Sequence, residues 1–408
     1  MFYKIRDTKE GRLNLYYLIA QGLYWMTMCC TISLGSAYLT NRGYSTVSIG
    51  VLYAIAYLLA TVFQQVISAA TDSSNRINVL DVLAVLGGVL AIDLLISLGA
   101  DGKGFATGFT FFVAAMITTI LLPFINALNF YIERYNIHMN FGVARASGSF
   151  FFFVMSLIAG NLMKVISEKA APFLGLVTSV CFVCIVILIY KELKEINLTI
   201  ENNQDPLEEK EDNFDINSVR SFIYEYRMFF IFLIGVICFY FGHVLINNFI
   251  YQISINVGGD EGDTGGLLAF QAIVELPAMI FFSQLRDRFG SRFLLGLSGV
   301  FYFVKILFTT IATTVGMLYF SMIFQALAFA VFIPASVHFV DEIMSEKDAV
   351  KGQAFVTIAM TLSNLLSSLL GGFLIKYTGV TASLWFGTFV TACGAVIAIW
   401  GLARIKAK

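Results

Sequence analysis

Twelve apolar runs, each close to the length a helix needs to cross a bilayer, dominate this 408-residue chain. A spanning helix takes about 20 residues, and lipid leaves its backbone groups only one another as partners. Hydrophobic residues make up 58% of the chain and charged residues 13%, against about 25% charged residues in soluble domains. The sequence therefore predicts an all-α polytopic membrane protein and excludes an ordinary soluble enzyme.

The runs fall into two sets of six, separated by a polar, charge-rich segment that includes KELKEINLTIENNQDPLEEKEDNF. We predict an N-terminal six-helix bundle over 1–190, a cytoplasmic linker over 191–227 and a C-terminal six-helix bundle over 228–408. The predicted spans of the first set are 15–39, 46–70, 78–99, 104–128, 146–166 and 171–190. Those of the second set are 228–252, 264–284, 292–312, 314–340, 353–375 and 380–402.

Basic residues predict the sidedness of the chain. With an even number of spans both termini lie on one side, together with the linker and the even-numbered loops. That side holds twenty of the 26 Lys and Arg residues, the opposite side holds five, and Lys305 lies within a span. Because basic residues concentrate in cytoplasmic loops, both termini are expected in the cytoplasm of a protein of the cell membrane, inner or plasma.

A charged turn follows the second span of each half. The copy after span 8 is SQLRDRFGSR, and a weaker copy, ATDSSNR, follows span 2. An acid flanked by arginines at a helix end can bond neighbouring helix N-termini and basic side chains. Such a latch holds one packing of the two bundles and releases in the other, although a single copy would indicate only a charged cytoplasmic turn. The candidate gating residues are Asp72, Asp287, Arg288 and Arg292.

Taken together, the six-plus-six spans, the linker and the RDRFGSR turn resemble the major facilitator superfamily. Two stretches resemble its oligosaccharide–proton symporters, typified by lactose permease: FGVAR at 141–145 and QAIVELPAM at 271–279. The resemblance implies that Arg145 contacts a sugar and that Glu275 is the essential helix 8 glutamate. Lys305 falls where that family has an arginine.

The chain also departs from the symporter pattern. The family's helix 4 acid aligns with Asn129 and its stacking tryptophan with Phe152, while the helix 10 histidine and glutamate align with Gln325 and Ala328. The helix 11 lysine aligns with Met360, and its helix 7 acid partners align with Tyr240 and His243. Since the resemblance assigns the transported proton to the helix 10 glutamate, it supports a sugar as substrate better than it supports any one coupling site.

Ionisable residues deep in a span cost about 2.5–3.5 kcal/mol each on insertion scales and mark candidate functional sites. Glu275, near the middle of span 8, and Lys305, in span 9, are the proposed proton-coupling residues. We expect an ion pair between neighbouring helices that breaks when Glu275 takes up a proton. A static structural pair is the alternative, and Asp93 in span 3 is the reserve proton site.

Polar and aromatic residues within the spans supply a candidate sugar site. The guanidinium of Arg145 can bond two adjacent hydroxyls, although an arginine at a helix start can also extend to the membrane surface. Tyr24, Trp25 or Phe152 would form an aromatic platform, and interhelical hydrogen bonding is the alternative role for each amide. The candidate substrate-binding residues are Arg145, Asn129, Tyr24, Gln21, Phe152, His243, Asn248, Gln271, Gln325 and Asn364.

These features predict a secondary active transporter, a monomer that takes up a sugar or oligosaccharide with a proton by alternating access. An uncoupled sugar facilitator and an exporter of amphipathic small molecules are the alternatives. No nucleotide-binding glycine loop, nucleophile elbow or metal-ligand cluster appears, so neither an enzyme nor a cofactor is predicted. The expected partners are a small-molecule substrate, the proton and the bilayer. A net charge of −1 gives no indication of nucleic acid.

Overall fold

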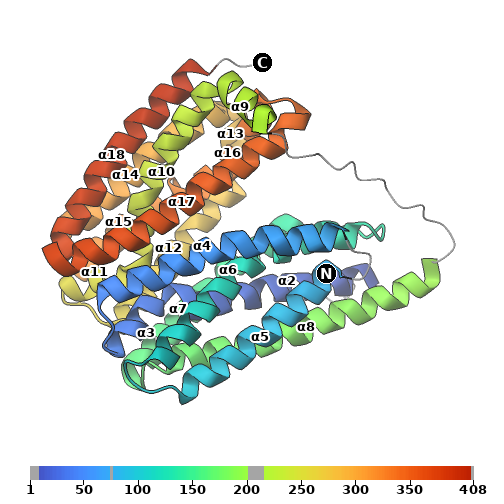
Figure 1. Ribbon diagram of the computed structural model, residues 1–408, viewed down its shortest axis with the longest axis horizontal. Coiled ribbons are helices and arrows are strands. Elements are labelled where there is room, and N and C mark those ends of the chain that lie inside the picture. Colours follow the sequence, from blue (N-terminus) through green and yellow to red (C-terminus); the bar gives the residue numbers. More distant parts are fainter. Residues whose placement is uncertain (1–8, 74–76, 201–215, 406–408) are drawn as a thin grey trace.

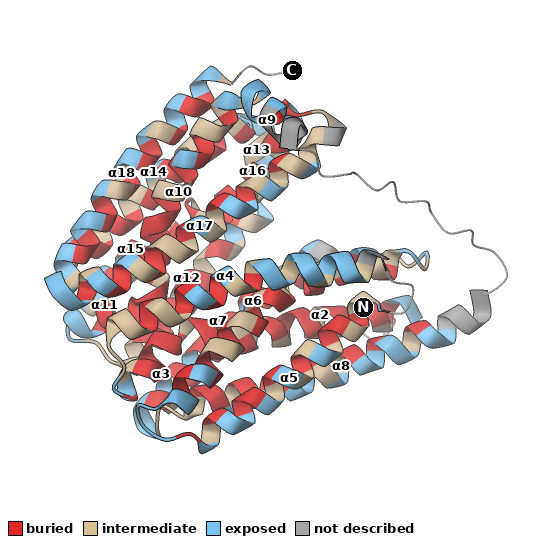
Figure 2. Cartoon of the chain, viewed as in Figure 1, coloured by how far each residue is buried: buried red, intermediate tan, exposed pale blue. Residues whose placement is uncertain are grey.

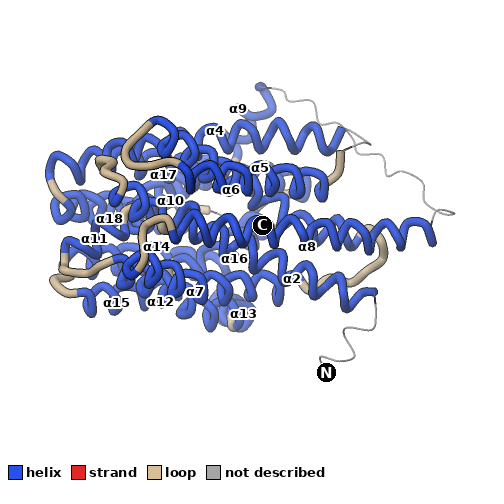
Figure 3. The backbone as a smooth tube through the Cα atoms, turned by 90° about the horizontal axis from the view of Figure 1, so that it is seen from below, coloured by secondary structure: helices blue, strands red, loops and turns tan. Residues whose placement is uncertain are grey.

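A computed structural model describes residues 9–73, 77–200 and 216–405 of the chain (Figure 1). Within these ranges every regular element is a helix, as the tube in Figure 3 shows. Ten helices are long and apolar enough to cross a membrane, and two bent helix pairs raise the number of candidate spans to 12. The predicted all-α membrane fold is therefore confirmed.

The described part of the N-terminal half contains seven α-helices, because the first span is interrupted by one π-helical turn. The elements are α2 (Lys9–Met28), the π-helix η1 (Cys29–Ser33), α3 (Gly35–Asn41), α4 (Thr46–Ser73), α5 (Val79–Gly99), α6 (Phe105–Glu133), α7 (Phe141–Val165) and α8 (Ala170–Ile200). Polar side chains start several of these helices. Asn78 and Asp81 form a reciprocal capping box at the start of α5, and Asn140 accepts from the backbone N–H of Val143 at the start of α7.

The C-terminal half has more interrupted spans. Its elements are α9 (Ile216–Glu225), α10 (Arg227–Asn248), α11 (Ile250–Asn256), α12 (Glu261–Ile280), α13 (Phe282–Phe289), α14 (Ser291–Ile311), α15 (Val315–Ile323), the 3-10 turn η2 (Phe324–Ala326), α16 (Phe329–Ile343), α17 (Glu346–Thr378) and α18 (Val380–Arg404). The axis bends by 56° between α12 and α13, just after Pro277. Proline removes a backbone donor and crowds the preceding turn, which accounts for a bend at this place.

The predicted linker is partly helical. The helix α8 passes the end of the predicted span at 190 and continues to Ile200. The guanidinium of Arg12 in α2 donates two hydrogen bonds to the carboxylate of Glu192, at 2.9 and 3.0 Å. The apolar pattern ends where the helix leaves the predicted membrane span, but the helix itself goes on because KELKEI contains good helix formers. The middle of the predicted linker, 201–215, lies outside the described residues.

The helices form two bundles that meet at one end and diverge toward the other (Figure 1). Both ends of the described chain lie at the diverging end, and we call this the terminal side and the opposite end the far side. Figure 2 shows exposed residues along the outer helices α8 and α18. Within its most apolar window, α10 is 72% buried, whereas α8 is only 33% buried. The helix α10 is therefore central, and much of the α8 surface faces the lipid.

Glycine pairs bring the two bundles into backbone contact. A Cβ atom added to Gly160 of α7 would lie 2.7 Å from the Cα of Gly265 in α12. One added to Gly372 of α17 would lie 3.1 Å from the Cα of Gly50 in α4. Small residues let membrane helices approach closely enough for van der Waals packing to hold them. These contacts therefore need glycine and close the two bundles on each other.

Polar contacts across the bundles accompany the glycines at the far side. Lys164 Nζ of α7 lies 2.7 Å from a carboxylate oxygen of Asp260, the N-cap residue of α12. The amide of Asn41 donates to Glu261 at 2.8 Å, and Gln252 donates to the hydroxyl of Thr40 at 2.7 Å. The far side is thus closed by ionic and amide contacts as well as by packing.

The ion pair between Asp260 and Lys164 should make far-side closure insensitive to pH between about 5 and 8. Burial alone would raise the pKa of Asp260, but hydrogen bonds from Lys164 Nζ and the backbone N–H of Asp263 hold it below its ordinary value. A carboxyl whose pKa is lowered in the closed form favours closure above about pH 3.9, and this contribution is lost as the pH falls through the lowered value. The pair is exposed, so water and salt screen it and its contribution to closure is small. Asp260→Asn should therefore raise the population of the open far side by up to about fivefold at neutral pH.

Double electron–electron resonance distances between spin labels at Lys103 and Lys376 would measure this opening. Both residues are exposed, Lys103 in the loop between α5 and α6 and Lys376 in the last turn of α17, so each bundle carries one label. These two segments lie at the far side (Figure 1). The three exposed cysteines would first be replaced. Lys169→Gln is the matched control, because it breaks a 2.7 Å ion pair with Asp101 inside one bundle. An unchanged distance distribution in Asp260→Asn would show that the pair does not contribute to closure.

Candidate substrate and proton site

A break in the tenth span places the amide that organises the C-terminal site. The span runs as α15, the short 3-10 turn η2 with Gln325 at its centre, and α16 beginning at Phe329. The hydroxyl of Ser298 in α14 donates to the backbone oxygen of Ala328 at 2.7 Å. Non-helical backbone is tolerated within a membrane span where a neighbouring side chain satisfies the freed groups. This hydrogen bond thus supports the break and fixes the position of Gln325.

Gln325 lies between the two charges that the sequence analysis paired. Its Nε2 donates to Glu275 Oε1 at 2.7 Å, and its Oε1 accepts from Lys305 Nζ at 2.7 Å. Among the described residues no direct ion pair joins Glu275 to Lys305, so the expected direct contact was wrong. An amide is both donor and acceptor, so it can join a carboxylate and an ammonium that do not touch.

The hydrogen bonds continue from Lys305 to a histidine. Lys305, which is fully buried, also donates to Gln271 Oε1 at 2.8 Å, and Gln271 Nε2 donates to Asn247 Oδ1 at 3.3 Å. Asn247 Nδ2 lies 2.9 Å from Nε2 of His243. We call the connected side chains the C-bundle network: Glu275, Gln325, Lys305, Gln271, Asn247 and His243. The network joins helices α10, α12 and α14 with the tenth span.

Aromatic rings enclose the histidine end of the C-bundle network. The His243 ring stacks on Phe329 with centroids 5.2 Å apart, and it meets Tyr302 and Tyr240 at 5.3 and 5.0 Å. His243 is therefore a buried member of the bundle interior, and Asn247 links it to the rest of the network. Its contact with substrate stays a prediction.

In the N-terminal bundle, Arg145 lies over the ring of Trp25. The guanidinium carbon is 4.3 Å from the ring centroid, a cation–π distance. Arg145 Nη1 and Trp25 Nε1 are both buried and lack a hydrogen-bond partner among the described residues. Gly148 permits this arrangement, because a Cβ there would lie 2.4 Å from the indole ring. Arg145 is thus half-buried and turned toward α2, with an unused donor.

Further unpartnered polar atoms lie on α2 and α6 of the same bundle. Gln21 Nε2 donates to the hydroxyl of Tyr17 at 3.0 Å and to Asn126 Oδ1 at 3.1 Å. Its own Oε1 is buried and has no partner among the described residues, and the same holds for Oδ1 of Asn129. Asn126 is a further polar residue here that was not predicted, although its spacing of three from Asn129 places both on neighbouring parts of one helix face. We call Gln21, Trp25, Asn129 and Arg145 the N-bundle polar cluster.

The two sites lie on facing sides of the bundles. The charges of Arg145 and Glu275 lie close enough to interact, although one residue is on α7 and the other on α12. The same two helices pack directly on each other at the far side. A solute bound between the bundles would therefore meet both sites at once.

The other predicted substrate-binding residues have different positions. Tyr24 is buried inside the N-terminal bundle and donates to the backbone oxygen of Thr118 at 3.0 Å, so Trp25 rather than Tyr24 lies beside Arg145. Phe152 meets the edge of Trp25 at 6.4 Å. Asn248 donates to Ser368 at 2.8 Å and contacts Tyr57 of the other bundle, which makes it an interface residue. Asn364 is half-buried on α17.

The charged turn between α13 and α14 makes local contacts in this conformation. Asp287 pairs with the adjacent Arg286 at 2.9 Å, and Arg288 lies over the ring of Phe289 at 5.3 Å. Arg292 is half-buried at the start of α14. The side chain of Asp72 lies outside the described residues. This turn lies on the diverging terminal side, and its gating role stays a prediction.

Asp93, the reserve proton site, is isolated from both clusters. It is 7% exposed on α5, and its Oδ2 is buried with no hydrogen-bond partner among the described residues. The helix α5 packs on α6 and α8, inside the N-terminal bundle.

Several solved transporters are similar to this chain in structure. The chain is similar to a mutant form of the nucleoside transporter NupG, with a TM-score of 0.78, 17% identity, and coverage of 97% of this chain and 100% of that one. A bacterial homologue of the human lysosomal transporter Spinster, in its inward-facing unoccupied conformation, has a TM-score of 0.70, 11% identity and 98% coverage of both chains. A mutant form of the peptide transporter POT has a TM-score of 0.71 and 9% identity, covering 95% of this chain and 93% of that one.

The fold is that of membrane transporters of the major facilitator type. The sequence model of the MFS_1 like family matches residues 18–386, nearly the whole chain, and the protein belongs to that family. No curated protein matches the chain in sequence.

Proposed function

We propose that this transporter takes up a sugar, or a solute with a similar array of hydroxyls, together with a proton. The observation that supports it best is the pairing of two polar sites across the bundles. The N-bundle polar cluster has unused hydrogen-bonding atoms, and the C-bundle network contains a buried carboxylate. With the termini in the cytoplasm, as the basic residues predict, the far side is external and this conformation opens inward. Alternating access then requires the glycine contacts of the far side to separate.

Substrate hydroxyls would bind first to the N-bundle polar cluster. The guanidinium of Arg145 offers a fork of donors, and its contact with Trp25 holds that fork in one orientation. The free oxygens of Gln21 and Asn129 can accept hydrogen bonds from the same hydroxyls. A sugar satisfies these groups in a way that an apolar solute cannot.

Protonation of Glu275 would couple to this binding through charge. While Glu275 is ionised, its attraction for Arg145 competes with the substrate for the guanidinium. When Glu275 takes up a proton, that attraction ends and Arg145 becomes available to the hydroxyls. Lys305 keeps its contacts with Gln271 and Gln325, so its charge remains stabilised within the network. Proton and substrate then bind cooperatively, as a symporter requires.

Two other transport modes are alternatives within the same fold. In an uncoupled facilitator the C-bundle network would be a static structural element. An exporter of amphipathic compounds would need a largely apolar central site, which the unpartnered polar atoms do not favour. A nucleoside, the substrate class named for one similar structure, has ribose hydroxyls for the cluster and an aromatic base, so nucleosides belong in the substrate panel.

Glu275→Gln should abolish proton-driven accumulation while keeping solute exchange, because the amide mimics the protonated carboxyl and cannot release a proton. The measurement is uptake of labelled mono- and disaccharides and nucleosides into proteoliposomes under an imposed inward proton gradient. For the unaltered protein, accumulation should disappear with an uncoupler. In Glu275→Gln the inside-to-outside ratio should fall to about one, since exchange alone cannot concentrate a solute.

Asp93→Asn is the matched control, since it neutralises the other buried carboxyl without touching either site. If Asp93→Asn rather than Glu275→Gln loses accumulation, the proposed coupling site is in the wrong bundle. Exchange without accumulation in the unaltered protein would identify a facilitator. Neither uptake nor exchange of any panel member would overturn the proposed substrate class.

A further inference from the structure

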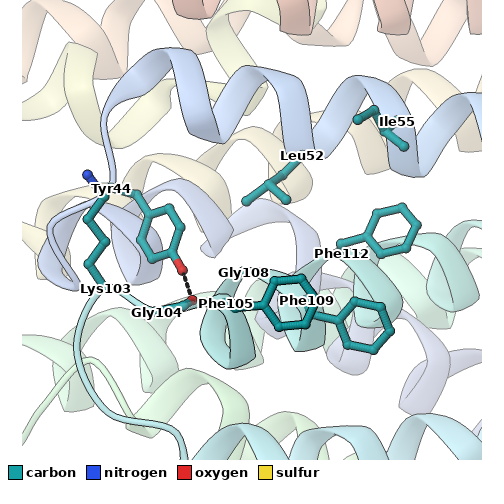
Figure 4. A pocket seen from close by; sticks show the side chains of 9 residues that line it. All are labelled: Tyr44, Leu52, Ile55, Lys103, Gly104, Phe105, Gly108, Phe109 and Phe112. Atoms are coloured by element: carbon teal, nitrogen blue, oxygen red, sulfur yellow. Dashed lines mark hydrogen bonds between the residues drawn. The ribbon is translucent and has the colours of Figure 1, made fainter.

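An apolar groove lies on the side of the N-terminal bundle, between α4 and α6 (Figure 4). Its volume is about 540 Å³, within the range of about 300–1,000 Å³ that holds small ligands. Its lining comes from the two helices and the loops that precede them, and the residues are Tyr44, Leu52, Ile55, Lys103, Gly104, Phe105, Gly108, Phe109 and Phe112. None of these belongs to the N-bundle polar cluster or the C-bundle network.

The walls of the groove are suited to a hydrocarbon chain. Phe105 and Phe109 stack with centroids 5.5 Å apart, and Phe105 is 86% exposed on the surface that faces the lipid. The hydroxyl of Tyr44 donates to the backbone oxygen of Gly104, as Figure 4 shows, so its polar atom already has a partner. An acyl chain would bury these rings, whereas the hydroxyls of a sugar would have no free hydrogen-bonding group along the rings.

One cation lies at the far-side end of the groove. Lys103 is exposed in the loop between α5 and α6, and it forms no ion pair with any of the described residues. The nearby acid, Asp101, is already paired with Lys169 at 2.7 Å. A lysine at the end of a membrane helix lies at headgroup depth, where it attracts lipid phosphate.

We propose that this groove binds an anionic phospholipid, with one acyl chain between α4 and α6 and the headgroup phosphate on Lys103. The opposite face of α4 packs on α17 of the other bundle, where Gly50 meets Gly372. A lipid held against α4 therefore supports the closed far side from outside. The site is independent of the transported solute and does not depend on the proposed function.

The first test compares lipids retained by the detergent-purified full chain in native mass spectrometry. Phosphatidylglycerol and phosphatidylcholine of identical chains would be added at equal concentration. We expect at least a fivefold preference for phosphatidylglycerol and its loss in Lys103→Ala. Lys376→Ala is the matched control, because Lys376 is also exposed at the far side but lies on α17, away from the groove.

A second pair of variants tests the groove itself. Ile55→Trp would fill the groove from a position that is 44% exposed, and Ile92→Trp would add the same bulk on the lipid-facing surface of α5, where Ile92 is 62% exposed. Ile55→Trp should lose the bound lipid and Ile92→Trp should keep it. If both Lys103→Ala and Ile55→Trp still retain phosphatidylglycerol, the proposed lipid site is overturned. If Ile55→Trp loses the bound lipid but the unaltered protein does not prefer phosphatidylglycerol to phosphatidylcholine, the role of Lys103 is overturned.

Discussion

Lys305→Met is expected to abolish proton-driven accumulation and to lower the thermal stability of the protein. The lysine is fully buried and donates hydrogen bonds to Gln271 and Gln325. Methionine has a similar length but no donor, so two amide oxygens lose their partner, at a cost of about 1–3 kcal/mol each. Glu275 loses the nearest positive charge within its own network and favours the protonated form at all stages of the cycle. A carboxyl that does not release its proton cannot drive accumulation.

The measurement combines thermal unfolding in detergent with uptake into proteoliposomes. We expect accumulation to fall at least tenfold and the unfolding temperature to drop. The double variant Lys305→Met with Glu275→Gln separates the two effects, since removing both charges leaves no uncompensated ion. Its stability should recover only in part, because the two amide oxygens still lack the lysine donor, and accumulation should stay lost. Normal accumulation by Lys305→Met would exclude the C-bundle network from coupling.

Arg145→Lys is expected to weaken substrate binding at least tenfold while leaving the fold intact. A lysine keeps the positive charge, but its compact ammonium cannot lie flat on Trp25 and present a fork to two hydroxyls together. Losing one charge-assisted hydrogen bond and the fixed orientation should cost about 1.4 kcal/mol or more of binding free energy. This corresponds to a factor of about ten in affinity. Folding should be retained because a cation remains at a half-buried position.

Binding would be followed by calorimetry with the solute that the uptake panel identifies. Trp25→Phe should have a smaller effect, because phenylalanine still offers a ring face to the guanidinium. Arg134→Lys is the matched control, since Arg134 is exposed at the end of α6. Equal affinities in Arg145→Lys and Arg134→Lys would place the substrate away from Arg145.

The spans, the all-helical fold and the family follow from the sequence alone, because each depends on local properties. The length of an apolar run determines whether a helix can cross the bilayer, whatever its neighbours are. The charged turn RDRFGSR and the segment FGVAR are contiguous, so they can be recognised without knowing the packing. The burial of Glu275 and Lys305 was also predictable, since both lie within apolar runs.

Only the tertiary structure decided which side chains meet. The rotation of each helix about its axis depends on packing against its neighbours, and hydropathy does not specify it. Trp25 rather than Tyr24 therefore lies under Arg145, although the two are adjacent in sequence. Gln325 separates Glu275 from Lys305 because a 3-10 turn, supported from another helix, sets the direction of its amide. Such contacts join residues far apart in the chain, and no local pattern encodes them.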